Sequence, residues 1–259
     1  MLPGKFIRQG GGRIDCQGRS ADQQNIRRAD GVYCLGEYAH IQSFAVQHDV
    51  RADDSAASRA VRDAVRLYTA SSLEEEPPER VLSGTYLRRF PEKFFAYYRR
   101  HMLYPSARPN AAHRALAQLE REGKLAAVIT QNIDGLHQAA GSKNVFELHG
   151  SVHRNYCQKC GKFFDVNYVV NAKGVPYCDE CGGIIKPDVV LYEEGLDSQT
   201  INGAVRAISK ADMLIIGGTS LVVYPAAGMI DYFKGKYLAV LNRDATSRDK
   251  QADLCLQTH

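Results

Sequence analysis

The sequence predicts an α/β fold: a Rossmann-like parallel sheet with a small inserted module. Apolar runs of strand length at 125–129, 213–216 and 237–241 are typical of buried parallel strands. Segments with helical spacing alternate with these runs, which is the pattern of a parallel sheet covered by helices. Two Cys-x-x-Cys pairs lie between the first two runs and indicate an inserted metal-binding module.

Composition places the chain among globular proteins. Its 259 residues are 44% apolar and 24% charged, enough for a large domain and a small one. The net charge of +4 is too small to argue for a nucleic-acid partner. The start lacks the apolar region of a signal peptide, and no run reaches membrane-spanning length. We therefore expect a cytoplasmic monomer with no membrane partner, and seven cysteines suit a reducing compartment, with Cys16, Cys34 and Cys255 as free thiols.

Residues 1–66 differ from the rest of the chain. Their basic residues are nine Arg and one Lys, and seven of their eight acidic residues are Asp. The glycines at 10–12 have no strand before them and no helix after them, so they are a weak phosphate-binding signal. The stretch 53–66 has apolar residues at helical spacing, which predicts one helix.

Two helices are predicted before the first apolar run. An aromatic stripe at helical spacing over 91–102 indicates a core or groove wall, and it comprises Phe94, Phe95, Tyr98 and Met102. Asn110 is a suitable N-cap for the next helix, and Gly123 is a suitable end for it. His101 and His113 are interpreted as ordinary surface or packing residues.

Polar groups follow the strand at 125–129 and a second, shorter strand at 145–148. The first is followed by Gln131, Asn132, Ile133 and Asp134, and the second by His149. Groups at the carboxyl ends of parallel strands face a ligand crevice. In isolation, however, Asn-Ile-Asp-Gly could be an ordinary turn, and a lone histidine is more often structural. An imidazole titrates near neutral pH, so His149 is the candidate for proton transfer.

The cysteine pairs have the spacing of a four-thiolate zinc site. Cys157 and Cys160 are separated from Cys178 and Cys181 by seventeen residues, which fits a closed, structural tetrahedral site. Four buried or disulfide-linked cysteines are the alternative.

Further ligand candidates follow the later strands. Gly217 and Gly218 allow close backbone approach, and Thr219 and Ser220 carry hydroxyls that could hold phosphate or ribose. A helix face precedes them at 201–208. The stretch 189–194 could be an edge strand or a buried strand.

Together these motifs resemble the sirtuins, the NAD-dependent protein-lysine deacylases. The matching motifs run from about Leu67 to Cys255 and comprise Thr130-Gln-Asn-Ile-Asp134, Glu147-Leu-His-Gly150, the cysteine quartet, Lys186-Pro-Asp-Val-Val190, Gly217-Gly-Thr-Ser220 and Asn242. The resemblance implies NAD and zinc as cofactors and acyl-lysine proteins or peptides as substrates. It implies His149 as the base and nicotinamide-side contacts from Gln131, Asn132, Ile133 and Asp134. It implies nucleotide-side contacts from Gly218, Thr219, Ser220, Asn242, Arg243 and Cys255.

The resemblance implies an opening strand, a Gly-Ala-Gly phosphate turn and a Gly-Ile-Pro-Asp-Phe-Arg loop, and neither motif occurs in this chain. We therefore divide it into an atypical segment 1–66 and a sirtuin-like domain 67–259, with a zinc ribbon at about 154–187. We expect the first strand-turn unit to be replaced, and the loss of that strand and turn would leave the neighbouring sheet edge unpaired. Segment 1–66 is either the product of a shifted reading frame or a substituted N-terminus, or a divergent module. Two alternatives to deacylation follow: a catalytically inactive acyl-lysine-binding protein and an ADP-ribosyltransferase.

Overall fold

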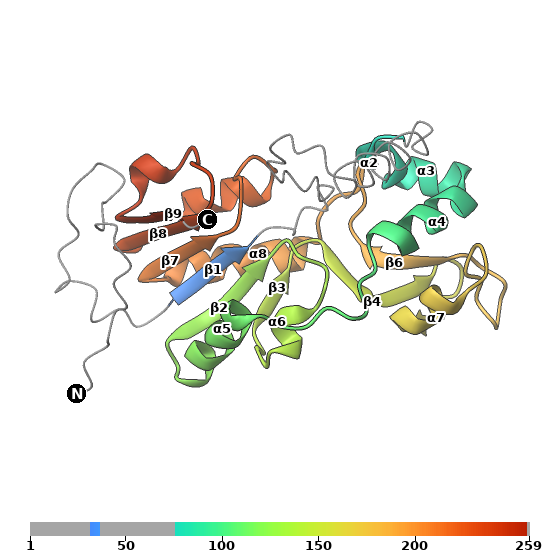
Figure 1. Ribbon diagram of the computed structural model, residues 1–259, viewed down its shortest axis with the longest axis horizontal. Coiled ribbons are helices and arrows are strands. Elements are labelled where there is room, and N and C mark those ends of the chain that lie inside the picture. The colour runs from blue at the N-terminus through green and yellow to red at the C-terminus, as the bar shows by residue number, and fades with distance from the viewer. Residues whose placement is uncertain (1–31, 37–75, 258–259) are drawn as a thin grey trace, which may run out of the picture.

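The computed structural model describes residues 32–36 and 76–257. The chain forms two lobes that lie end to end (Figure 1). The large lobe is built on a six-stranded sheet, and the small lobe on a three-stranded sheet with a group of helices. The predicted helix at 53–66 and the glycines at 10–12 lie outside the described residues.

The large sheet is parallel throughout and has the strand order β3-β2-β1-β7-β8-β9. The predicted strands are confirmed as β2 (Leu125–Thr130), β3 (Val145–Glu147), β7 (Met213–Gly217) and β8 (Tyr237–Asn242), and β9 (Leu254–Gln257) completes one edge. The strand order reverses between β1 and β7, which is where ligands bind in open parallel sheets. The fold class is therefore as the sequence predicts.

A strand occupies the place of the unit that we expect to be replaced, so the expectation of an unpaired sheet edge there is wrong. Strand β1 (Val32–Gly36) lies in the middle of the sheet and pairs in parallel with β2 on one side and β7 on the other. The strand is only five residues long and stands within a segment rich in Arg and Asp. Its place is decided by backbone pairing to strands about 90 and 180 positions further along the chain, which no local pattern reveals.

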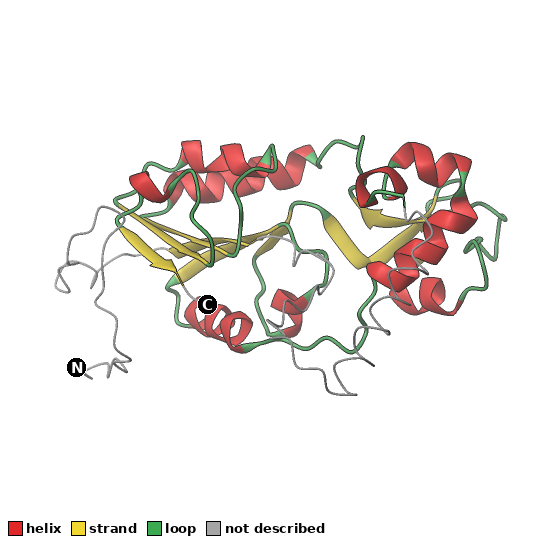
Figure 2. Cartoon of the chain, turned by 45° about the horizontal axis from the view of Figure 1, so that its top comes forward, coloured by secondary structure: helices red, strands yellow, loops and turns green. Residues whose placement is uncertain are grey.

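Helices cover both faces of the large sheet (Figure 2). Helix α8 (Ser198–Lys210) and the 3-10 helix η1 (Ala226–Tyr232) pack on each other and share the aliphatic core with the strands. Helix α5 (Ala111–Arg121) packs on β2 and on the short α6 (Leu136–Ala139). Asn110 is the N-cap of α5, as predicted, and accepts a hydrogen bond from the His113 backbone N–H. A short 3-10 helix, η2 (Asp249–Gln251), precedes β9.

The small lobe has a core of its own. Strands β4 (Gly150–Cys157), β5 (Phe163–Phe164) and β6 (Ile185–Val189) form an antiparallel sheet with β4 in the centre, and α7 (Val166–Asn171) packs on β4. Helix α2 (Pro78–Val81) contributes Val81 to this core, and helices α3 (Gly84–Arg89) and α4 (Pro91–His101) contribute aromatic side chains. The predicted stripe is confirmed, because Phe94, Phe95 and Tyr98 of α4 are fully buried.

The strand near residue 190 ends earlier than predicted. The strand is β6, at the edge of the small sheet, and it stops at Val189, so the prediction of a strand over 189–194 is wrong. The Tyr192 backbone instead bonds to Leu82 and Gly84 beside helix α3, while the Val190 N–H donates to the His149 carbonyl. This segment therefore connects the helices of the small lobe to His149.

In the described part of the chain, no helix combines the length and the apolar character needed to cross a membrane.

Candidate functional site

The loop after β2 presents its polar groups at the junction of the two lobes. Thr130 ends the strand and is buried, and its Oγ1 accepts a hydrogen bond from the Asn132 backbone N–H at 3.0 Å. Ile133 is buried in the core of the small lobe. Asp134 accepts from the Leu136 backbone N–H at 2.9 Å, which makes the loop turn into α6. Aspartate favours such a turn because its short side chain can accept a hydrogen bond from the backbone N–H two residues further along the chain.

His149 stands beside this loop. Leu148 before it is buried in the core of the large lobe, and its N–H donates to the Thr130 carbonyl at 2.9 Å. The Nδ1 atom of His149 lies 3.1 Å from the carbonyl oxygen of Gln131. A carbonyl can only accept, so Nδ1 carries the hydrogen, and Nε2 is the nitrogen that can take a proton.

The protonation state of the His149 imidazole is suitable for a general base. Burial lowers the pKa of its imidazole, and the hydrogen bond to Gln131 offsets this only in part. The imidazole is therefore neutral at neutral pH.

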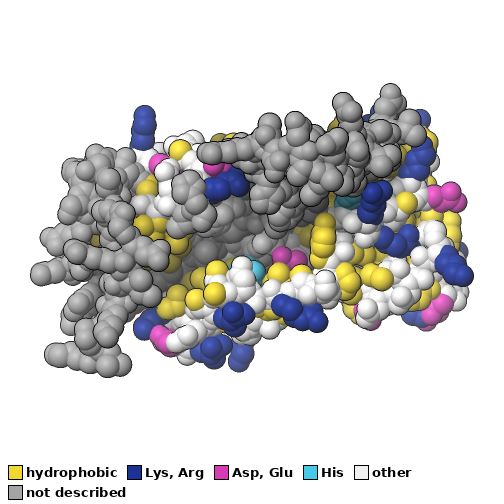
Figure 3. Space-filling view, in the orientation of Figure 1, with side chains coloured by type: hydrophobic (Ala, Val, Ile, Leu, Met, Phe, Trp, Pro, Cys, Tyr) yellow, Lys and Arg dark blue, Asp and Glu magenta, His cyan; other side chains and the backbone are white. Residues whose placement is uncertain are grey.

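A cleft of about 520 Å³ opens over Gln131 and His149. Its walls come from the small-lobe helices, the segment after β6 and the loop after β7, and they include Tyr97, His101, Met102, Tyr192 and Tyr224. In Figure 3, hydrophobic side chains gather along the visible part of the boundary between the lobes. The prediction that Met102 belongs to a groove wall is confirmed. His101 and Tyr97 also line the cleft, and the sequence analysis missed them because a helical stripe does not tell which side of it meets a cavity.

A second group of predicted residues lies at the ends of β7 and β8. Thr219 is buried, and its Oγ1 accepts from the Leu221 N–H at 3.2 Å. The Asn242 side-chain amide donates to the Thr219 carbonyl at 3.1 Å and to the Asp244 carbonyl at 2.9 Å. Gly218 has a φ of 62°, and its missing side chain leaves open space above the turn. Asn242 and Thr219 thus form one turn, continued by exposed Ser220, at the sheet edge where nucleotides bind in such folds.

Two predicted residues are placed less favourably for ligand contact. Arg243 is exposed and forms an ion pair with its neighbour Asp244 at 3.0 Å. Cys255 lies in β9 opposite Val240, and its sulfur is 3.6 Å from the Asp249 carbonyl oxygen. The expectation that Cys255 is a free thiol is wrong, because it is disulfide-bonded. The side chains of Cys16 and Cys34 lie outside the described part of the structure.

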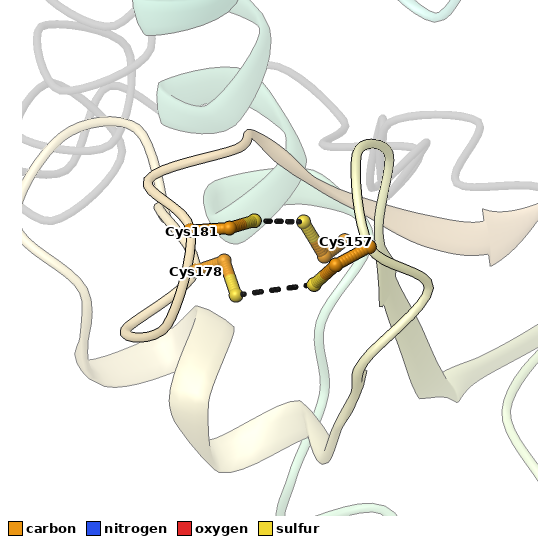
Figure 4. Close-up of side chains that lie close together, drawn as sticks. Cys157, Cys178 and Cys181 are labelled. Atoms are coloured by element: carbon orange, nitrogen blue, oxygen red, sulfur yellow. Dashed lines mark hydrogen bonds between the residues drawn. The ribbon is translucent and has the colours of Figure 1, made fainter.

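The four cysteines converge in the small lobe, as predicted (Figure 4). All four sulfurs lie within 4.8 Å of one another. The Cys157 and Cys181 sulfurs are 3.4 Å apart, and those of Cys160 and Cys178 are 3.7 Å apart. A zinc–sulfur bond of about 2.3 Å places tetrahedral ligands about 3.8 Å from each other, so this donor set fits a zinc ion.

The thiols of the cluster differ in their pKa values. Burial raises the pKa of the Cys157 thiol, but the backbone N–H groups of Cys160 and Lys159 outweigh this and lower it to about 6. The backbone N–H of Lys162 lowers the pKa of Cys160, yet the neighbouring Cys181 thiol and burial raise it to about 12. Although a backbone hydrogen bond lowers the pKa of Cys181, the neighbouring Cys157 thiol and burial raise it overall, and a bound cation would favour the thiolate form of such groups.

The loop at the junction also holds a buried acceptor that a bound ligand could satisfy. The Asn132 side-chain oxygen is buried and has no hydrogen-bond partner among the described residues. A buried amide oxygen without a partner is costly, and it is the kind of group that a bound ligand satisfies.

Comparisons with known proteins agree with this geometry. The family model described as "Sir2 family" matches residues 58–225. A protein named NAD-dependent protein deacetylase from Clostridium acetobutylicum is 59% identical over 191 residues, covering 73% of this chain and 78% of that protein. A protein of the same name from Clostridium perfringens is 61% identical over 180 residues, covering 69% and 74%.

Solved structures give the same answer. Sir2 bound to a propionylated peptide is 32% identical, with a TM-score of 0.69 and 89% of each chain covered. A complex of Sir2 with a p53 peptide and NAD+ is 31% identical, with the same TM-score and coverage. This chain belongs to the Sir2 family, the sirtuins.

Proposed function

We propose that this protein removes acyl groups, acetyl among them, from protein lysines at the expense of NAD. The products are free lysine, nicotinamide and O-acyl-ADP-ribose. The observation that carries the proposal is His149, whose Nδ1 is held by the Gln131 carbonyl at the floor of the cleft between the lobes. The names of the relatives support it, as does a solved Sir2 complex with 2′-O-acetyl-ADP-ribose and a deacetylated p53 peptide.

NAD supplies a ribose that loses nicotinamide and accepts the acyl group, and water supplies the oxygen that completes hydrolysis. His149 takes the proton from a ribose hydroxyl through Nε2, since Nδ1 is committed to Gln131. Gln131, Asn132 and Asp134 orient the nicotinamide end, with the unpartnered Asn132 oxygen as a natural acceptor there. Ile133 belongs to the same loop, and its burial in the small-lobe core fixes the position of the loop.

The turns after β7 and β8 would bind the adenosine and phosphate end of NAD. Gly218 allows close approach, and Thr219 and Ser220 offer hydroxyls and backbone groups to phosphate or ribose. Asn242 holds the turn through the Thr219 carbonyl and faces the adenosine ribose. Arg243 and Cys255 complete this end.

Zinc is the second cofactor, held by Cys157, Cys160, Cys178 and Cys181. The four thiolates fill a tetrahedral shell, so the ion is structural and takes no part in the reaction. It stabilises a module at about 154–187, within the sirtuin-like domain 67–259. We assign residues 1–66 to an atypical segment that contributes β1 to the sheet.

The substrates are acyl-lysine proteins or peptides, which enter the cleft as an extended chain beside β6, the edge strand of the small sheet. The protein acts as a cytoplasmic monomer and does not use nucleic acid or a membrane.

Nicotinamide release from NAD, with an acetyl-lysine peptide present, tests the proposal on the zinc-loaded chain. His149→Ala should reduce the rate by about 10² to 10⁴ because the proton acceptor is lost. Tyr177→Ala is the control, since this exposed ring of the small lobe does not line the cleft. No release by the folded, zinc-bound protein would leave a non-catalytic acyl-lysine-binding protein, and gain of ADP-ribose on a protein would indicate a transferase.

A further inference from the structure

Strand β4 carries a bulge directly beside the active-site loop. Its pairing with β6 joins Ser151 to Asp188 and then Asn155 to Pro187. Three residues of β4, 152–154, thus have no counterpart on β6. Bulges next to active sites redirect side chains and end regular pairing.

The three bulged residues turn toward the groups around His149. The Val152 N–H donates to the Ile133 carbonyl at 3.0 Å. His153 Nε2 lies 3.0 Å from the Asp134 carbonyl oxygen. Arg154 bonds Glu147 of β3 and Asp188 of β6, both at 2.7 Å. Arg154 therefore anchors the backbone from which His153 reaches the loop.

His153 holds the Asp134–Gly135 turn in two ways. A carbonyl only accepts, so His153 donates through Nε2–H. Gly135, with a φ of 67°, rests on the imidazole: a Cβ at this position would lie 2.8 Å from His153 Cδ2. The main chain at Asp134 is thus fixed from β4, while the Asp134 carboxylate is fixed by the Leu136 N–H.

We propose that His153 is a positioning residue that sets the nicotinamide-binding loop of this enzyme through the Asp134 carbonyl. The inference rests on the proposed function. His153 is exposed and does not line the cleft, so it acts on the site only through this turn. Its loss should weaken the use of NAD more than the use of the acyl-lysine peptide.

The expected effect is moderate. A hydrogen bond contributes about 1 kcal/mol net, which corresponds to about a fivefold change in an equilibrium constant. His153→Ala should therefore raise the KM for NAD about fivefold and leave the peptide KM and the thermal midpoint nearly unchanged. His153→Gln keeps an N–H donor on a flexible side chain and should restore most of the NAD KM.

The test compares the wild type, His153→Ala, His153→Gln and the control Gln158→Ala. The Gln158 side chain is exposed just beyond β4, and its amide donates to the carbonyl of the neighbouring Tyr156. Both KM values, kcat and zinc content are measured, together with hydrogen–deuterium exchange of the segment 130–139. That segment should exchange several times faster in His153→Ala alone.

An NAD KM within twofold of the wild type in His153→Ala would overturn the proposal. So would equal losses in both KM values with a lower thermal midpoint, because that pattern describes general destabilisation. If the wild type releases no nicotinamide, the proposed function fails by itself. Exchange in 130–139 then decides the positioning role, and unchanged exchange rejects it.

Discussion

The two lobes keep their shape by different means. The large lobe buries an aliphatic core between parallel strands and helices, with Leu214, Ile216 and Ile208 among its fully or almost fully buried members. The small lobe has short antiparallel strands, and its core mixes aromatic rings with the buried thiols of Cys157 and Cys178. One lobe depends on aliphatic burial, and the other combines an aromatic-rich core with a cluster of four cysteines that fits a metal ion.

The active-site candidates lie on the seam between these two cores. Ile133, within the loop after β2, packs into the small-lobe core, whereas Leu148, next to His149, packs into the large-lobe core. Gln131 and His149 nevertheless meet through a single hydrogen bond. The geometry of the site therefore depends on both lobes, and each can be perturbed separately.

Loss of zinc should produce the largest difference in stability between the two lobes. Structural zinc contributes about 10–16 kcal/mol in zinc-finger peptides, which is comparable to the whole stability of many domains. Cys178→Ala should therefore release the metal and abolish hydrogen-exchange protection in β4, β5 and β6, while β7 and β8 stay protected. Mass spectrometry of the intact protein gives the zinc content. Equal loss of protection in both lobes would show that they fold as one unit.

Truncating the two seam residues should affect the lobes selectively. Ile133→Ala and Leu148→Ala each delete buried methyl groups and should cost about 2–5 kcal/mol in free energy of unfolding. Exchange protection should drop first in the small lobe for Ile133→Ala and first in the large lobe for Leu148→Ala. Ile133→Val, costing about 0.5–1.5 kcal/mol, is the milder control. Identical exchange patterns for the two alanine variants would refute the assignment of Ile133 and Leu148 to separate cores.

Acid should weaken the loop region through His137. Burial and, to a smaller extent, the neighbouring His113 lower the pKa of His137 to about 4, although Asp134 opposes both. The unfolded chain binds this proton near pH 6.5, so stability is present above that pH and is lost as the pH falls toward 4. The shift corresponds to about 3 kcal/mol.

Urea unfolding between pH 7 and 4 measures this loss. His137→Leu should flatten the pH dependence in that window because it removes the titrating group. His101→Leu is the control histidine, since it lies in the cleft wall. A steep pH dependence that persists in His137→Leu would assign the acid sensitivity to other groups.

Local sequence patterns predicted many of the strands, helices and candidate site residues, and the wrong predictions share one cause. The strands, the α5 cap at Asn110, the aromatic face of α4 and the cysteine quartet each depend on neighbouring residues or on a ligand spacing that chemistry restricts. β1, the early end of β6 and the contact of His153 depend on partners that are distant in the sequence. A five-residue strand in an Arg-rich segment has no periodicity strong enough to reveal such partners.

The sequence by itself determined the parallel α/β class, the cysteine quartet with metal-ligand spacing and the type of residue at each strand end, because these follow from periodicity, capping and coordination chemistry. Only the tertiary structure decided that β1 occupies the centre of the sheet, that His149 Nδ1 meets the Gln131 carbonyl, and that a bulge directs His153 onto the loop. The position of β1 arises from strand pairing within the large sheet, and the two histidine contacts arise where the two cores meet. Their geometry is a property of the packed chain and is carried by no single segment.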